Sequence, residues 1–243
     1  MRQKQLRRRG FTESAPLRET AFTRVELCAT LAAITLLALI VAPVLANTTY
    51  GGERAACFNN MRLIGQGVAS WAGDHQGGVP WRVSVNDGGT WPSSGTKPGN
   101  AWFEYSVLSN ELRTPKILVC PADAKVLVVA TFQDYIRSGY RAGATSYGLG
   151  MEWFPEEPRS WLSGDRHVRV DPANASPCSA KIVGFERIDP ANSVVAWTNN
   201  VHGTVGGNIV LHDGSVSFVA SENLRAVLTR ATDAGSTHFL RAR

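Results

Sequence analysis

The chain has 243 residues, of which 44% are hydrophobic, and it carries a formal net charge of +5. A chain of this length can bury a sizeable core without a metal ion or several disulfides. The basic excess is concentrated in the first twenty residues, where six Lys and Arg side chains accompany two Glu side chains. Basic residues that precede a first apolar helix hold that end of the chain in the cytoplasm. The charge therefore indicates membrane topology, and nucleic acid is not an expected partner.

Residues 1–21 are polar and show no apolar periodicity, so we interpret them as a cytoplasmic leader peptide. Residues 22–46 follow as an apolar run in which Glu26 is the single carboxylate. As a helix its last twenty residues extend about 30 Å, enough to cross a bilayer. A secretory signal is the alternative, because Val44-Leu45-Ala46 has the spacing of a signal-peptidase site. A carboxylate in a membrane segment implies a binding partner, so Glu26 favours a retained membrane or assembly helix.

Residues 47–76 are predicted to form the amphipathic half of the same helix, lying on a globular domain. Pro43 is expected to kink or melt the helix, and the Gly51-Gly52 pair is expected to fray or break it. Beyond these positions apolar residues recur at intervals of three and four, which places them on one face of a helix ending near Asp74. This apolar stripe consists of Cys57, Met61, Ile64, Val68 and Trp71.

Residues 77–243 are predicted to form a beta-rich globular head with long loops. The stretch 77–102 is rich in Gly, Pro, Ser and Asn, which are turn residues. Its tryptophans, Trp81, Trp91 and Trp102, either attach the loops to a core or form a surface that binds carbohydrate or a partner. A short helix is expected over residues 102–112. Strands are expected over residues 116–119, 126–132, 145–149, 181–185 and 193–198.

The clearest local signal in the head lies in residues 208–219. Two apolar runs meet there at Asp213-Gly214, a dipeptide that strongly favours a β-hairpin turn. After the hairpin, Ser221 is expected to cap a short helix over residues 222–232. That helix places Leu224, Val227 and Leu228 on one side.

The sequence contains no recognisable catalytic or cofactor motif: zinc-protease, nucleophile-elbow, phosphate-loop and dinucleotide patterns are all missing. Three histidines lie near aspartates in the sequence, which is compatible with a metal or acid–base site, although histidines that hold turns are the favoured interpretation. Calcium needs several converging oxygens, and the aspartates, Asp171 among them, form no dense acidic loop. We therefore predict no enzyme, no catalytic residue, no metal and no cofactor. The histidines and aspartates considered are His167, His202, His212, Asp165 and Asp213.

A basic leader, a small residue and then Phe-Thr-x-x-Glu open the hydrophobic run at residues 21–26. This arrangement resembles the cleavage and methylation segment of type IV prepilins and type II secretion pseudopilins. The resemblance implies that a prepilin peptidase cuts between Ala21 and Phe22 and that the new amino group of Phe22 is methylated. Glu26 and Pro43 then fall where pilins carry Glu and Pro. In such filaments the Glu of one subunit meets the amine of its neighbour, and pairing of this kind makes a buried charge tolerable.

Cys57 is followed by Asn-Asn-Met-Arg-Leu-Ile-Gly from residue 59, and Cys120 opens a Cys-Pro-x-Asp element. His202 is followed by ten residues before Asp213-Gly214. These stretches resemble a large group of prepilin-like proteins with variable beta-rich heads, abundant in planctomycete and verrucomicrobial bacteria. The resemblance implies a Cys57–Cys120 disulfide, which an oxidising compartment permits. Sequence cannot fix the connectivity, and two free buried cysteines are the alternative.

The whole chain is thus expected to be an α+β, pilin-like protein, with a long N-terminal helix, transmembrane in its first half, packed on an antiparallel beta-rich C-terminal head. The expected location is the bacterial inner membrane, in a single pass with the leader cytoplasmic and the head periplasmic. Prepilin peptidase, inner-membrane lipid and other pilin or pseudopilin subunits are the expected partners. The alternative is a membrane-anchored or secreted binding module, for example with a glycan-recognising head, that uses the helix only as an anchor or signal.

Overall fold

The computed structural model describes residues 23–152, 160–171, 182–183, 186–188, 194–198, 201–202, 206–228 and 237–240. The predicted leader and Phe22 lie outside these residues, as does Cys178. The chain divides into two compact units, Met1–Asn47 and Thr48–Arg243. The second unit is the head of the following sections.

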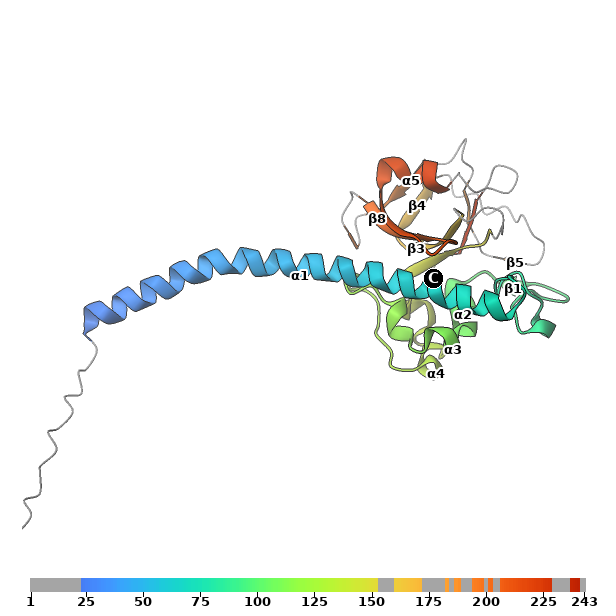
Figure 1. The fold of residues 1–243 in the computed structure, drawn as a ribbon, viewed down its shortest axis with the longest axis horizontal. Coiled ribbons are helices and arrows are strands. Elements are labelled where there is room, and N and C mark those ends of the chain that lie inside the picture. The colour runs from blue at the N-terminus through green and yellow to red at the C-terminus, as the bar shows by residue number, and fades with distance from the viewer. Residues whose placement is uncertain are drawn as a thin grey trace, which may run out of the picture. The chain divides into compact units, whose positions relative to one another are not determined.

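The helix α1 (Arg24–Asp74) is the longest element and belongs to both units (Figure 1). It begins with a reciprocal cap. Thr23 Oγ1 accepts a hydrogen bond from the Glu26 amide (3.2 Å), and Glu26 Oε2 accepts one from the Thr23 amide (2.8 Å). The backbone stays helical at residues 43, 51 and 52, so the predicted melting or break there is wrong. Two glycines cost only about 2 kcal/mol relative to alanine, which a helix extended on both sides tolerates.

The predicted apolar stripe of α1 is confirmed, because all five of its side chains are buried in the main hydrophobic core. The helix also ends at Asp74 as predicted. Past that residue the chain turns sharply at Gln76 and Gly77, which have φ angles of 55° and 82°. The amides of His75 and Gly77 both bond to the Ala72 carbonyl and so close the last turn.

A six-stranded antiparallel sheet forms the centre of the head, in the order β6-β10-β2-β3-β8-β9. The predicted hairpin over residues 208–219 is confirmed by the antiparallel pairing of β8 with β9. The strands are β2 (Tyr147–Gly150), β3 (Trp161–Asp165), β6 (Glu186–Ile188), β8 (Gly206–Leu211), β9 (Val216–Ala220) and β10 (Thr237–Leu240).

Successive side chains of the central strands point to opposite faces of this sheet. One set packs with the α1 stripe, and the other packs with α5 (Ser221–Leu228). Figure 1 shows α5 on one side of the sheet and the shorter helices α2 to α4 on the other. The first set includes Leu162, Val210 and Leu240, and the second includes Trp161, Ile209 and Phe239.

Smaller elements surround the sheet. β1 (Lys97–Pro98) pairs in parallel with β5 (Ile182–Val183), and β4 (Val168–Asp171) pairs antiparallel with β7 (Val194–Trp197). The short helices are α2 (Ala101–Val107), α3 (Ser109–Leu112) and α4 (Phe132–Tyr135). Three 3-10 helices complete the described head: Val85–Asp87, Pro115–Leu118 and Arg141–Ala144.

Three local predictions are wrong, and capping explains two of them. Pro115 starts a 3-10 helix over the predicted strand 116–119, with the Thr114 hydroxyl accepting from the Lys116 amide. The predicted strand 126–132 is irregular and leads into α4, which Thr131 caps. The expected helix 102–112 is two helices separated at Leu108. The α+β class with an antiparallel sheet is nonetheless the class observed.

Candidate functional site

The first candidate site is the apolar segment at the start of α1, Arg24–Val41. This stretch has a mean hydropathy of 2.0, and none of its side chains is buried. It is long and apolar enough to cross a membrane, by length and composition, and it lies near the N-terminus, where a signal sequence would have the same character. A helix that is apolar on all sides is stable only when lipid or other helices cover it. The segment therefore has the length and composition of a membrane span or of a signal sequence.

Glu26 is the only acidic residue in this segment, and its carboxylate accepts hydrogen bonds at the N-terminal end of α1. Its Oε2 accepts hydrogen bonds from both the amide and the hydroxyl of Thr23, at 2.8 and 2.9 Å. Of the other predicted residues here, Ala21 and Phe22 lie outside the described residues. Pro43 is helical in its backbone, and its side chain lies outside the description.

The second candidate site is a buried polar cluster in the head, built around a disulfide. Cys57 of α1 and Cys120 are bonded, with a Cα–Cα distance of 4.9 Å across a sequence separation of 63 residues. This is the pair implied by the resemblance, and it ties α1 to the segment that follows the 3-10 helix Pro115–Leu118. Both cysteines are fully buried. The bond therefore works as a staple inside the core.

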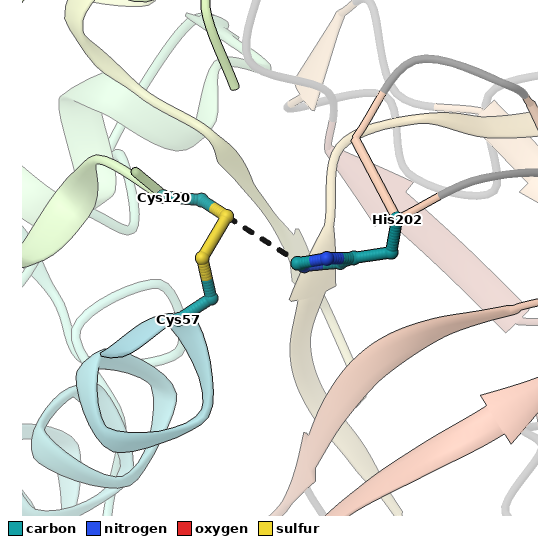
Figure 2. A group of neighbouring side chains, drawn as sticks. All are labelled: Cys57, Cys120 and His202. Atoms are coloured by element: carbon teal, nitrogen blue, oxygen red, sulfur yellow. Dashed lines mark hydrogen bonds between the residues drawn. A yellow bond between two sulfur atoms is a disulfide. The ribbon is translucent and has the colours of Figure 1, made fainter. Parts of the chain in front are cut away.

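His202 lies against this disulfide, as Figure 2 shows, with its Nε2 atom 3.6 Å from Cys120 Sγ. The side-chain amide of Asn208, in β8, lies 3.0 Å from the same nitrogen. Burial, together with the positive charge of Arg54, lowers the pKa of His202. The imidazole is thus held neutral, with Nε2 directed toward sulfur.

Asp165, at the end of β3, brings a carboxylate to the same place. Its Oδ2 accepts a hydrogen bond from the Asn208 amide (2.7 Å) and lies 3.6 Å from His202 Nε2. Its Oδ1 has no hydrogen-bond partner in the described part of the chain. Burial, and then the negative charge of Asp123, raise the pKa of Asp165 to about 7. The interior thus contains a carboxyl group that is readily protonated near neutral pH.

Asp123, from the Cys-Pro-x-Asp element, is buried beside these residues and is paired. Arg166 reaches its two carboxylate oxygens at 2.9 and 3.2 Å, and His167 Nε2 lies 3.5 Å away. Burial alone would raise the pKa of Asp123, but His167 and Arg166 outweigh it, so the net shift is downward. Asp123 is therefore held as a carboxylate.

The Asp213-Gly214 pair forms the turn between β8 and β9. Gly214 has a φ of 78°, a conformation that favours glycine, and Asp213 Oδ1 accepts from the Ser215 amide (2.8 Å). The turn lies against α1, because a Cβ added at Gly65 would meet Val210 at 3.0 Å and Gly214 at 3.6 Å. His202 and the turn, grouped by the resemblance, thus have separate roles: contact with the disulfide and close approach to α1.

The loop tryptophans support the core-attachment interpretation. Trp81 is fully buried in the main core, and Trp91 and Trp102 are partly buried against it. Arg141 stacks over the Trp102 ring at 4.8 Å from its centroid. Trp81 is therefore unavailable as a binding surface.

The remaining predicted residues each have a local partner. His212 Nε2 lies 2.8 Å from the Glu152 carbonyl, which agrees with a histidine that holds a turn. Asp171 is exposed and pairs with Arg169 at 2.9 Å. Sequence reasoning missed Asn208 and the pairing of Arg166 with Asp123. The pairing carried a partial signal, since Asp123 belongs to the Cys-Pro-x-Asp element that resembles this group of heads.

No protein-family model, no curated protein and no solved structure matches this chain. The candidate sites therefore rest on the residues and geometry described above. Among the described His, Cys, Asp and Glu residues, the group that could hold a metal ion is Cys57, Cys120 and His202.

Proposed function

We propose that this chain is a non-enzymatic pilin- or pseudopilin-like subunit. A prepilin peptidase cuts it between Ala21 and Phe22, and the mature chain assembles through its hydrophobic helix into a type IV pilus or a type II secretion-type filament. Before assembly it resides in the bacterial inner membrane in a single pass, with the leader cytoplasmic and the head periplasmic.

The observation that carries this proposal is the uncovered apolar segment Arg24–Val41 with a single carboxylate near its start. A simple anchor has no use for Glu26, since an ionisable group in a membrane segment costs a few kcal/mol. A helix that leaves the bilayer and packs among copies of itself needs both features. The apolar surface supplies packing contacts, and the carboxylate sets the register of neighbouring subunits.

The cap at the start of α1 is compatible with this role of Glu26. Both hydrogen bonds from Thr23 end on Oε2, and an ionised carboxylate has acceptor sites on both oxygens. Oε1 is the atom that we assign to the amine of a neighbouring Phe22. The Cys57–Cys120 disulfide supports a head that resides in an oxidising compartment such as the periplasm.

N-terminal sequencing of the mature protein tests the proposal directly. The full chain is expressed with and without a prepilin peptidase, and the first residue is determined in each case. The proposal expects Phe22 only when the peptidase is present. A mature chain that starts at Asn47 would identify a secretory signal, and one that keeps Met1 in both hosts would identify an uncut anchor. Either result sinks the proposal.

A substitution separates assembly from anchoring. Glu26→Gln removes the charge and keeps the size of the side chain, so membrane insertion should persist while filament incorporation is lost. Glu53→Gln, which changes a carboxylate elsewhere on α1, is the matched control and should assemble normally. Incorporation is measured by cross-linking and by the fraction of protein in sheared filaments. Normal incorporation of Glu26→Gln would favour a membrane-anchored binding module.

A further inference from the structure

Three side chains that commonly bind metals meet where α1 joins the head. Cys57, Cys120 and His202 place two sulfur atoms and one imidazole nitrogen within 4.8 Å of one another, and all three residues are buried (Figure 2). They come from α1, from the segment after residue 118 and from the segment before β8, so the fold brings them together. In the oxidised protein the His202 imidazole contacts a sulfur atom that is already bonded to its partner cysteine.

We propose that Cys57, Cys120 and His202 form a Zn²⁺ site when the disulfide is reduced. The two cysteines then join α1 to the head by a covalent bond in the oxidised protein and by a metal ion in the reduced protein. This inference concerns the head alone and does not depend on filament assembly.

A thiol reductant converts the disulfide form of the head into the reduced form that binds the metal ion. Two equivalents of thiol supply two electrons and two protons, the Cys57–Cys120 bond breaks, and the reductant leaves as its own disulfide. Each cysteine takes up one of the protons. Zn²⁺ then displaces both protons into solvent and binds two thiolates.

The distances suit a tetrahedral ion. Zn–S bonds of about 2.3 Å and Zn–N bonds of about 2.0 Å place neighbouring ligand atoms roughly 3.3 to 3.8 Å apart. Cys120 Sγ and His202 Nε2 are already 3.6 Å apart. Reduction lets the two sulfurs separate by rotation about the Cα–Cβ bonds, while α1 and the segment at residue 120 stay packed in the same core.

Asp165 lies outside the three-residue group but next to its histidine, and we assign it as the fourth ligand. Its Oδ2 lies 3.6 Å from His202 Nε2, close to the N–O separation of about 3.3 Å in a tetrahedral zinc site. Asp165 is 2% exposed, and its Oδ1 accepts no hydrogen bond from the described part of the chain. A buried carboxylate oxygen without a donor is stabilised by a cation. The backbone amide of Asn208 donates a hydrogen bond to Oδ2 at 2.7 Å and would orient the carboxylate toward the ion.

Asn208 also competes with the metal ion. Its side-chain amide donates to the same Nε2 atom at 3.0 Å, and this hydrogen bond must be exchanged for the bond to Zn²⁺. The Asn208→Ala variant therefore binds the metal at least as tightly as the parent protein. This distinguishes a competitor from a ligand.

The test uses the full chain in detergent, in a Cys28→Ser/Cys178→Ser background that leaves only Cys57 and Cys120 as thiols. The protein is reduced anaerobically with a thiol, desalted and titrated with Co²⁺, which reports its ligands by absorption. The proposal expects a thiolate-to-cobalt charge-transfer band and visible d–d bands that saturate at one ion per chain. Excess Zn²⁺ should remove these bands, and the oxidised protein should show none.

Variants then assign the ligands. His202→Ala should weaken Co²⁺ binding at least about 100-fold, since even outer-shell partners contribute about 10- to 100-fold. Asp165→Asn should weaken it about 10- to 100-fold. His167→Ala, a histidine that contacts Asp123 instead, is the matched control and should bind as the parent does.

Three outcomes overturn the proposal. The first is a reduced protein without a thiolate-to-cobalt band. The second is equal Co²⁺ affinity in the parent and in His202→Ala. The third concerns folding, monitored by far-ultraviolet circular dichroism of the reduced chain with and without Zn²⁺. A reduced head that unfolds and is not restored by Zn²⁺ rules out a metal staple.

Discussion

The apolar segment Arg24–Val41 and the interior of the head distribute polarity in opposite ways. The segment presents hydrocarbon on its surface, with no described side chain buried. The head contains carboxylates in its interior, among them Glu104, Asp123 and Asp165. Some of these carboxylates are paired inside the head, for example Glu104, which forms an ion pair with Lys97 at 2.6 Å. Among the described residues of its own unit the segment buries none of its side chains, and its composition is that of a membrane span or a signal sequence.

The disulfide provides the largest expected effect in this comparison. The double variant Cys57→Ser/Cys120→Ser should lower the free energy of unfolding of the head by about 4 kcal/mol, because it releases a long closed loop. Membrane partitioning of the segment should not change. Urea unfolding followed by tryptophan fluorescence measures the loss, since all seven tryptophans lie beyond residue 70. Cys28→Ser, in the segment, is the control and should unfold as the parent does.

Two truncations compare the halves of α1 directly. Met61→Ala should cost about 3 kcal/mol of head stability, because it leaves a cavity in the main core. Leu37→Ala, on the exposed segment, should change head stability by less than about 0.5 kcal/mol. The same urea transitions report both values. Equal losses from the two variants would mean that the segment is covered by the head, contrary to the comparison.

His212 tests how the head keeps a titratable group neutral. Burial lowers the pKa of His212 to about 4, from an ordinary value of 6.5. Between pH 4 and pH 6.5 the unfolded chain binds a proton at His212 more readily than the folded chain does. The contribution of neutral His212 to the free energy of unfolding is therefore complete above pH 6.5 and is lost as the pH falls toward 4. His212→Gln should reduce this slope by up to about 1 kcal/mol per pH unit. Stability measured from pH 4 to pH 7 checks it, and parallel curves for the two proteins would contradict it.

Two glycines give the smallest expected effects, and with opposite signs. Gly214→Ala should destabilise the head by about 1 kcal/mol, because the hairpin turn requires a positive φ. Gly51→Ala should increase the helical stability of α1 by about 1 kcal/mol, because a Cβ there meets open space on a helix. Thermal unfolding measured by circular dichroism distinguishes them. An unchanged melting temperature for Gly214→Ala would contradict the claim that the positive φ at this position destabilises other residues.

The elements that are specified by local sequence patterns could be predicted. The stripe from Cys57 to Trp71 and the Asp213-Gly214 hairpin are set by neighbours a few residues apart, and both are confirmed. The strands β3 and β10 gave no such signal. β3 is buried throughout, so it lacks polar alternation, and it contains both Gly164 and Asp165.

The candidate site in the head depended on contacts that sequence does not encode locally. His202 and Cys120 are 82 residues apart, and Asp165 reaches them only because β3 and β8 pair in the sheet. The resemblance implied the Cys57–Cys120 disulfide and also included His202, but it did not indicate that His202 lies against the disulfide. Cleavage at Ala21-Phe22 and the role of Glu26 stay predictions.

The position of the disulfide along α1 has a mechanical consequence. Cys57 is the first residue of the stripe, so a pull transmitted along the helix from its N-terminal side reaches the covalent bond before the packed residues up to Trp71. Without that bond, the stripe would peel from the head one turn at a time under low force. With it, the load passes from Cys57 through the disulfide into the head at Cys120, and the packed residues beyond Cys57 are not loaded. The disulfide therefore protects the packing of α1 on the rest of the head against a pull along the helix.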